Sequence, residues 1–184
     1  MSSRSHLSDA VPRCSEHEAA IEALNRAEHE EALALLGQAS EFQPEDMRIA
    51  IDRAKLLLQL GRLDEAEAAL QALPAAAQDD GDIGVLRAHV GFLRVADGAP
   101  SPEALAAHLE QAPEDSLARH RLAAQLLFRD DYADALEQLL ELVRRDREFD
   151  DGAGRRGMLA IFHVLGPAHP LVAQYREPLN DALR

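Results

Sequence analysis

Large apolar residues recur three and four positions apart over most of this chain, with polar residues between them. Two such rows are Leu56, Leu57, Leu60 and Leu63, and Leu136, Leu139, Leu140 and Val143. This spacing places apolar side chains on one face of an α-helix. No run of alternating apolar and polar residues is long enough to predict a β-sheet. The pattern therefore predicts an all-α chain.

The helical pattern repeats along the chain with a period of 34 residues, because Ala20, Ala32 and Leu36 recur as Ala54, Ala66 and Leu70. Ala123, Ala135 and Leu139 follow 69 residues later, which is two periods plus one residue. This period is that of the tetratricopeptide repeat, a pair of antiparallel helices stacked on its neighbours. We therefore predict a right-handed superhelix of antiparallel helix pairs with about nine or ten helices.

The repeat divides the chain into four helix pairs and a closing pair. Their predicted bounds are about 15–45, 46–78, 80–113, 115–147 and 151–184, all within one domain that spans 15–184. The third repeat is degenerate, and the Ala-Pro-Ser-Pro stretch at 99–102 accommodates its extra residue, since proline does not fit inside a helix. Residues 1–14 are expected to be a disordered leader or a remnant of cloning.

Residue types at the repeated positions fit this packing. A small residue on each helix, such as Ala54 or Ala66, lets two backbones approach closely where the helices cross. Pro44 and Pro113 end one helix, and Asp46 and Asp115 are predicted to cap the next.

Composition and charge restrict the possible partners. The chain has 47% hydrophobic residues and 4% aromatic residues, and no apolar run approaches the roughly 20 residues that cross a membrane. The N-terminus lacks the apolar core of a signal peptide, so a cytoplasmic location is expected. The net charge is −14, and the arginine cluster at 144–156 is interrupted by acidic residues. The simplest interpretation of the acidic surface is solubility, and the alternative is that it repels nucleic acid and anionic membranes. We expect no membrane and no nucleic-acid partner.

The sequence offers no set of residues suited to catalysis, metal binding or a cofactor. Cys14 is the only cysteine, which excludes a CxxC pair. His17 and Glu18 begin like a zinc-protease helix, but the second ligand position holds Ile21. Gly152-Ala153-Gly154 before two arginines lacks the preceding strand of a phosphate loop, so we read it as a loop with an N-cap. We predict a protein that is not an enzyme and holds no cofactor and no metal.

The first helix of each repeat lines the concave face of such arrays, and this face is the expected protein-binding surface. Its predicted lining is Ile21, Leu24, Ile51, Lys55, Leu58, His120, Ala124, Leu127 and Phe128. Asp52 stands where a clamp for an acidic tail needs an asparagine, so that clamp is absent. The mildly apolar lining favours an extended or unfolded chain. The alternative is that several of these residues pack against neighbouring helices.

The end of the chain is its most specific segment. Its first part runs from Arg144 to Leu159 and begins Arg144-Arg145-Asp146-Arg147-Glu148-Phe149-Asp150-Asp151-Gly152. Two further stretches follow, Ile161-Phe162-His163-Val164-Leu165-Gly166 and His169-Pro170-Leu171-Val172-Ala173-Gln174-Tyr175-Arg176. This closely resembles the C-terminal region of the bacterial YbbN/CnoX proteins, the chaperedoxins. Leu60-Gly61-Arg62-Leu63-Asp64-Glu65-Ala66 is also similar to that family, and the resemblance spans about 15–183.

The resemblance implies a co-chaperone or holdase that binds unfolded client proteins and docks to a chaperonin. The family's thioredoxin-like domain is not in this sequence, so redox activity does not carry over. In the family the C-terminal helix is associated with chaperonin docking, and here it would run over about 170–183. Its expected docking residues are Leu171, Val172, Tyr175, Arg176, Leu179 and Leu183.

Alternatives remain open at this point. The same stripe of residues can seal the last repeat as a cap, which every solenoid needs. The whole chain can also be a structural adaptor that recognises one folded partner or associates with itself. We expect a monomer or a weak homodimer.

Overall fold

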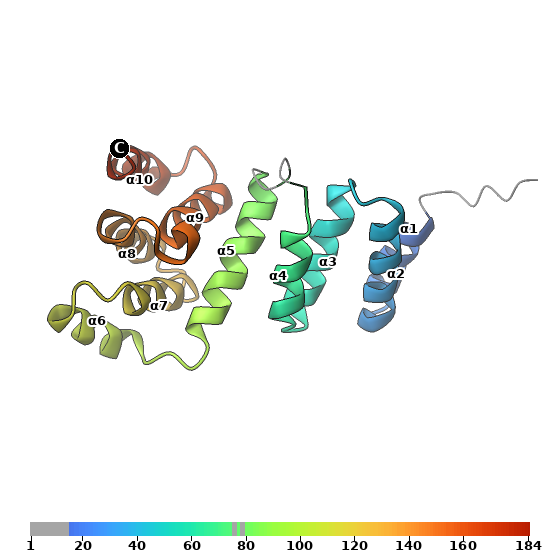
Figure 1. The fold of residues 1–184 in the computed structure, drawn as a ribbon, viewed down its shortest axis with the longest axis horizontal. Helices are drawn as coiled ribbons and strands as arrows, with labels where there is room; N and C mark the ends of the chain where they lie inside the picture. Colours follow the sequence, from blue (N-terminus) through green and yellow to red (C-terminus); the bar gives the residue numbers. More distant parts are fainter. Residues whose placement is uncertain (1–14, 75–76, 78–79) are drawn as a thin grey trace, which may run out of the picture. The chain divides into compact units, whose positions relative to one another are not determined.

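The computed structural model describes residues 15–74, 77 and 80–184, and these contain ten α-helices and no β-strand (Figure 1). The helices are α1 Ser15–Asn25, α2 His29–Phe42, α3 Met47–Gln59, α4 Leu63–Gln71, α5 Gly81–Ala96, α6 Pro102–Gln111, α7 Ser116–Leu127, α8 Tyr132–Arg145, α9 Phe149–Leu165 and α10 Pro170–Ala182. The predictions of an all-α chain and of about nine or ten helices are confirmed. The predicted leader, 1–14, lies outside the described residues. None of the described helices is long and apolar enough to cross a membrane.

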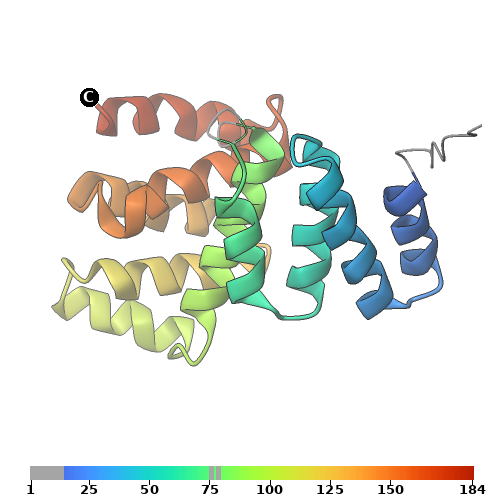
Figure 2. The same ribbon diagram turned by 45° about the vertical axis from the view of Figure 1, so that its right-hand side comes forward.

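The chain divides into two compact units, residues 1–74 and 75–184. In the first unit each helix packs against the next one along the chain, from α1 to α4, as Figure 2 shows. The four repeated alanines of this unit are fully buried, namely Ala20, Ala32, Ala54 and Ala66. Their small side chains allow the close helix crossings that the repeat predicts.

Local capping explains where several helices begin. The Asp46 carboxylate accepts a hydrogen bond of 3.0 Å from the backbone N–H of Arg48, and Asp115 accepts one of 2.9 Å from Ala118. These contacts confirm both predicted N-caps. In α6 the hydroxyl of Ser101 caps the helix and Pro102 occupies its first turn, where no backbone donor is needed.

The turn between paired helices uses the same backbone conformation in three repeats. Ala27, Gly61 and Asp130 occupy equivalent repeat positions, and their φ angles are 60°, 70° and 62°. Glycine adopts this left-handed conformation without steric cost, whereas alanine and aspartate are strained in it. The three repeats therefore share the backbone conformation of this turn, although the residue at the position differs.

The second unit departs from the predicted order at the third repeat. α5 packs chiefly against α9 and α7, while α6 packs against α7, so the region 80–113 does not form the antiparallel pair expected from the period (Figure 1). The link between α5 and α6 contains Gly98 in a left-handed conformation and Pro100, and Pro102 begins α6. This link turns the chain away from α5, and the apolar face of α5 is left for α9.

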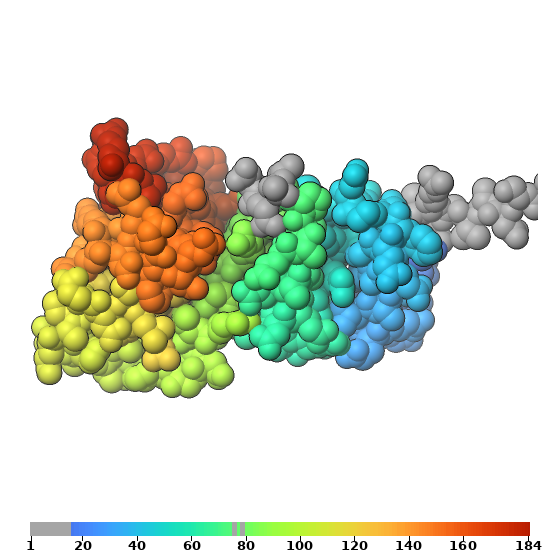
Figure 3. Space-filling model, viewed as in Figure 1, coloured from blue at the N-terminus to red at the C-terminus, as the bar shows by residue number. Residues whose placement is uncertain are grey.

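The remaining helices of this unit are layered in chain order, from α6 and α7 (yellow) through α8 and α9 (orange) to α10 (red), as Figure 3 shows. Two glycines of α9 permit its close approach to two neighbours. A Cβ atom at Gly157 would lie 2.8 Å from Phe92 of α5, and one at Gly154 would lie 2.9 Å from Val143 of α8. The core of this unit includes Phe92, Leu136 and Met158.

Candidate protein-binding sites

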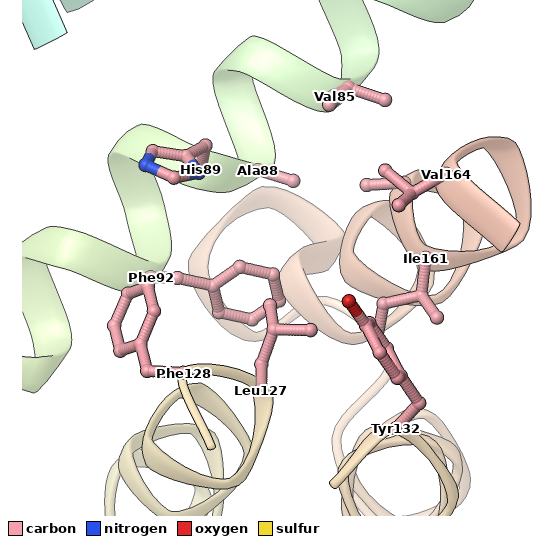
Figure 4. A pocket seen from close by; sticks show the side chains of 10 residues that line it. Val85, Ala88, His89, Phe92, Leu127, Phe128, Tyr132, Ile161 and Val164 are labelled. Carbon is pink, nitrogen blue, oxygen red and sulfur yellow. The ribbon is translucent and has the colours of Figure 1, made fainter. Parts of the chain in front are cut away.

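An apolar hollow in the second unit lies between α5, α7, α8 and α9, and we name it the apolar pocket (Figure 4). Its volume is about 220 Å³. Its lining is Val85, Ala88, His89 and Phe92 of α5, Leu127 and Phe128 at the end of α7, Tyr132 of α8, and Ala160, Ile161 and Val164 of α9. Because four helices contribute, the pocket exists only in the folded unit.

Two lining residues are unusually exposed for apolar side chains. Phe128 is 46% exposed and Val164 is 60% exposed. Phe128 caps the C-terminus of α7, so its ring lies beside the turn that leads into α8. Exposed apolar groups around an apolar hollow are typical of a surface that another molecule covers.

Few polar groups enter the apolar pocket. The ring of His89 lies edge-on to Phe128, with their centroids 6.3 Å apart, and desolvation by its surroundings lowers the pKa of His89. The hydroxyl of Tyr132 donates to Asp130 over 3.1 Å, and this hydrogen bond raises the pKa of Tyr132. At neutral pH both lining groups are therefore uncharged.

A second, polar hollow adjoins the apolar pocket, and we name it the arginine groove. Its volume is about 410 Å³, and its lining is Asp80, Gly81, Gly84, Val85, Arg87, Asp151, Arg155, Arg156, Leu159, Ala160 and His163. Val85 and Ala160 line both hollows. The two sites therefore meet along the contact between α5 and α9.

A left-handed turn contributes Asp151 to the lining of the arginine groove. Asp150, Asp151 and Gly152 have φ angles of 45°, 54° and 71° in succession, before the regular part of α9. Arg156 holds this turn, since its guanidinium donates to the carbonyl oxygen of Asp150 over 2.8 Å and also to that of Asp151. The turn at Gly152 agrees with the predicted loop, but Ala153 and Gly154 lie within α9 and no side chain caps its start, so the prediction of a loop with an N-cap is only partly right.

A third hollow lies in the first unit and is lined mainly by polar residues. Its volume is about 500 Å³, and its lining is His17, Glu18, Ile21, Glu22, Gln43, Asp46 and Arg48. The ring of His17 lies 2.9 Å from the carboxylate of Asp52 on α3, which ties α1 to α3. Ile21 is the one predicted binding residue among these lining groups.

The residues predicted for the concave face differ in exposure and location in the structure. Leu127 and Phe128 line the apolar pocket. Leu24, Ile51 and Leu58 are half-buried and Lys55 is exposed. His120 and Ala124 are buried, so neither is available as lining.

His120 lies in the core of the second unit and is only 2% exposed. Its ring lies 5.6 Å from that of Phe92 and 5.9 Å from that of Phe149, measured between centroids. Its Nδ1 has no hydrogen-bond partner among the described residues. Burial lowers the pKa of His120 to about 4, so the ring is neutral at physiological pH.

The predicted docking stripe of the C-terminal helix is largely covered. Val172, Tyr175 and Leu179 are buried against the core of the second unit. The Tyr175 hydroxyl donates to Glu137 of α8 over 3.1 Å. Leu171 and Leu183 are partly buried at the edge of the core, and Arg176 is exposed. In this conformation α10 acts as the cap of the last repeat, so only its outer residues can meet a partner.

Most of the apolar pocket was missed in the sequence. Val85, His89 and Phe92 lie on α5, in the degenerate repeat, and the repeated positions do not include them. Val164 was assigned to the closing helix pair without a role. The available signal was weak, because only the packing of α5 onto α9 brings these residues beside Phe128.

Among the described residues, no three histidine, cysteine, aspartate or glutamate side chains are close enough together to hold a metal ion. Cys14 lies outside the part of the chain that the structure describes.

Comparison with known proteins identifies two matching family models. Both carry the description tetratricopeptide repeat, and they match residues 23–90 and 95–183. No curated protein matches the chain. Among solved structures, it is similar to a domain of protein VP0806, of unknown function, from Vibrio parahaemolyticus RIMD 2210633. The identity is 22% and the TM-score 0.39, over 91% of this chain and 97% of that one.

Proposed function

We propose that this chain, whose residues 23–90 and 95–183 belong to the tetratricopeptide-repeat family, binds unfolded client proteins as a co-chaperone of the holdase type and docks to a chaperonin. Tetratricopeptide repeats are protein-interaction modules, so the two family matches support a protein partner. The resemblance of residues 144–176 to the chaperedoxins supports the chaperone role.

The observation that carries the proposal is the apolar pocket with its exposed rim. Unfolded chains expose apolar side chains that a folded protein hides, and an open apolar hollow gives such a side chain a place to be buried. Burying one leucine or phenylalanine side chain contributes about 1.5–3 kcal/mol. A single pocket of this kind supports weak, reversible binding, which suits a protein that holds a client and then releases it.

The first test measures how well the purified chain suppresses the aggregation of a heat-denatured client. We expect the double variant Phe128→Ser with Val164→Ser to lose most of this protection, because it removes the exposed apolar rim of the pocket. Both positions are exposed, so the fold should persist, and circular dichroism checks this. Phe42→Ser is the matched control, since Phe42 is 72% exposed and does not line the pocket. Equal loss of protection in both variants would contradict the assignment to this pocket.

Chaperonin docking is assigned to the exposed face of α10, where Arg176 lies between the partly buried Leu171 and Leu183. We expect the chain to co-migrate with a chaperonin in size-exclusion chromatography, and Arg176→Glu to weaken this several-fold. Deletion of α10 would expose the core that Val172 and Leu179 cover, so a loss of docking after this deletion could result from unfolding. The point variant Arg176→Glu is therefore the better test. Unchanged co-migration of Arg176→Glu would remove Arg176 from the docking surface. No co-migration of the unmodified chain would refute docking itself.

The second candidate function is an assembly adaptor that recognises one folded partner or a second copy of itself. The exposed Phe42 at the end of α2 favours it, because this ring belongs to the first unit and is not part of the lining of the apolar pocket. An adaptor would retain one stoichiometric partner and would not suppress client aggregation. Sedimentation of the chain alone separates self-association from binding to another protein.

A further inference from the structure

We propose that the apolar pocket and the arginine groove form one recognition surface for a polypeptide segment that carries an acidic side chain next to an apolar one. This inference rests on the proposed function and adds the charge of the segment that is bound. The apolar side chain would enter the apolar pocket, and the carboxylate would pair with Arg155 in the groove.

Shared walls make the two hollows a single surface. Val85 of α5 and Ala160 of α9 belong to both linings, so an extended segment that leaves one hollow enters the other directly. Leu159, which is 42% exposed, lies in the arginine groove beside the cations. Three of the six exposed large apolar side chains of the described residues therefore lie along these two hollows: Phe128, Leu159 and Val164.

The dimensions of the apolar pocket favour a side chain over a small-molecule ligand. Pockets for small molecules usually have volumes of about 300–1,000 Å³ and contain several converging polar groups. The apolar pocket has about 220 Å³, and its polar groups are His89 and the hydroxyl of Tyr132, which already donates to Asp130. One or two apolar side chains of a peptide fit these dimensions.

The charges of the groove select a carboxylate. Asp151 is shared, since it lies 3.1 Å from Arg156 and 3.9 Å from Arg87. The carboxylate of Asp80 accepts hydrogen bonds from the backbone N–H groups of Asp82 and Ile83, so it is engaged at the start of α5.

His163 of the groove pairs with Asp82 over 3.1 Å. Arg155 is exposed and forms no ion pair with any described residue, so its charge is available to a partner. Arg155 is therefore the cation that an incoming carboxylate would meet.

The overall charge of −14 opposes this preference at long range, because it attracts basic peptides. At physiological ionic strength the Debye length is about 8 Å, so a bound segment responds mainly to charges in direct contact. The local charge of Arg155 then outweighs the distant acids. At low salt the preference should shrink, as the long-range repulsion of an acidic peptide grows.

The test uses three short fluorescein-labelled peptides with one central leucine, flanked on both sides by glutamate, glutamine or lysine. Fluorescence anisotropy with the full chain at physiological salt measures their affinities. We expect the glutamate peptide to bind about threefold to tenfold more tightly than the lysine peptide, the range of one or two exposed ion pairs. Arg155→Glu should abolish or reverse this order. Arg144→Glu is the control, because Arg144 is another exposed arginine of the second unit and lines neither hollow, and it should leave the order unchanged.

Each result bears on a different claim. The three peptides could bind equally well to the unmodified chain and fail to bind to the Phe128→Ser and Val164→Ser double variant. That result would overturn the charge preference but would leave the proposed client binding at the apolar pocket intact. Tightest binding of the lysine peptide would also overturn it. Failure of all three peptides to bind, together with no suppression of client aggregation, would refute the proposed function itself.

Discussion

Replacing Gly154 by alanine should lower the free energy of unfolding of the second unit by about 2 kcal/mol, although alanine is the better helix former. The added Cβ would lie 2.9 Å from Val143 Cγ2, 3.1 Å from the carbonyl oxygen of Leu139 and 3.3 Å from the backbone nitrogen of Val143. Two of these atoms belong to the backbone of α8, which cannot move aside as a side chain can. α9 must therefore shift away from α8, and the core between them opens.

Gly91 of α5 is the matched control. An added Cβ there meets nothing within 4 Å, so Gly91→Ala should stabilise the chain by about 0.5–1 kcal/mol through its helix propensity alone. Urea denaturation measures both variants. The chain has no tryptophan and two tyrosines, Tyr132 and Tyr175, both in the second unit, so tyrosine fluorescence reports on that unit. The account of α9 would be wrong if Gly154→Ala were as stable as Gly91→Ala.

Acidification should destabilise the second unit through His120. The pKa of this ring is about 4 in the folded protein and 6.5 in the unfolded chain, so the unfolded state binds the proton more tightly. Stability from the neutral ring is complete above pH 6.5, and it is lost as the pH falls from 6.5 towards 4. Between pH 7 and pH 5 the expected loss is about 2 kcal/mol, and below pH 4 it levels off at about 3 kcal/mol.

Charges on α9 modify this shift without reversing it. Asp150 raises the pKa of His120, Arg156 lowers it, and burial is the larger effect. His120→Leu fills a similar volume without a titratable group. The difference in urea midpoint between pH 7 and pH 5, followed by tyrosine fluorescence, should therefore be larger in the unmodified chain than in this variant. The same difference in both would show that acidic side chains, and not His120, set the acid sensitivity.

These two positions illustrate what the repeat pattern could not predict. Gly154 was interpreted from its neighbours as part of a loop, and His120 from its register as part of the binding face. The repeat register predicts which face of a helix a residue lies on. It does not predict which other helix packs against that face. In the structure α5 and α9 both pack near α7, so Phe92 and Phe149 cover His120.

The binding surface was predicted in part for the same reason. Leu127 and Phe128 were identified because they follow the repeat at the end of α7. Val85, His89 and Val164 were not identified, since they belong to a degenerate repeat and to the closing helix. The C-terminal stripe was read correctly as amphipathic. Its periodicity left open whether a partner or the protein itself covers Val172 and Leu179, and in the structure the core of the second unit covers them.

The sequence by itself determined the helical class, the repeat, the buried alanines and the caps at Asp46 and Asp115, because these depend on contacts between residues close in the chain or one period apart. Only the tertiary structure decided that α5 leaves its expected partner α6 and packs on α9. That choice depends on the fit of Phe92 against Gly157, between residues far apart in the sequence, and on the link that turns α6 away. The apolar pocket and the arginine groove both follow from this single packing of α5 against α9.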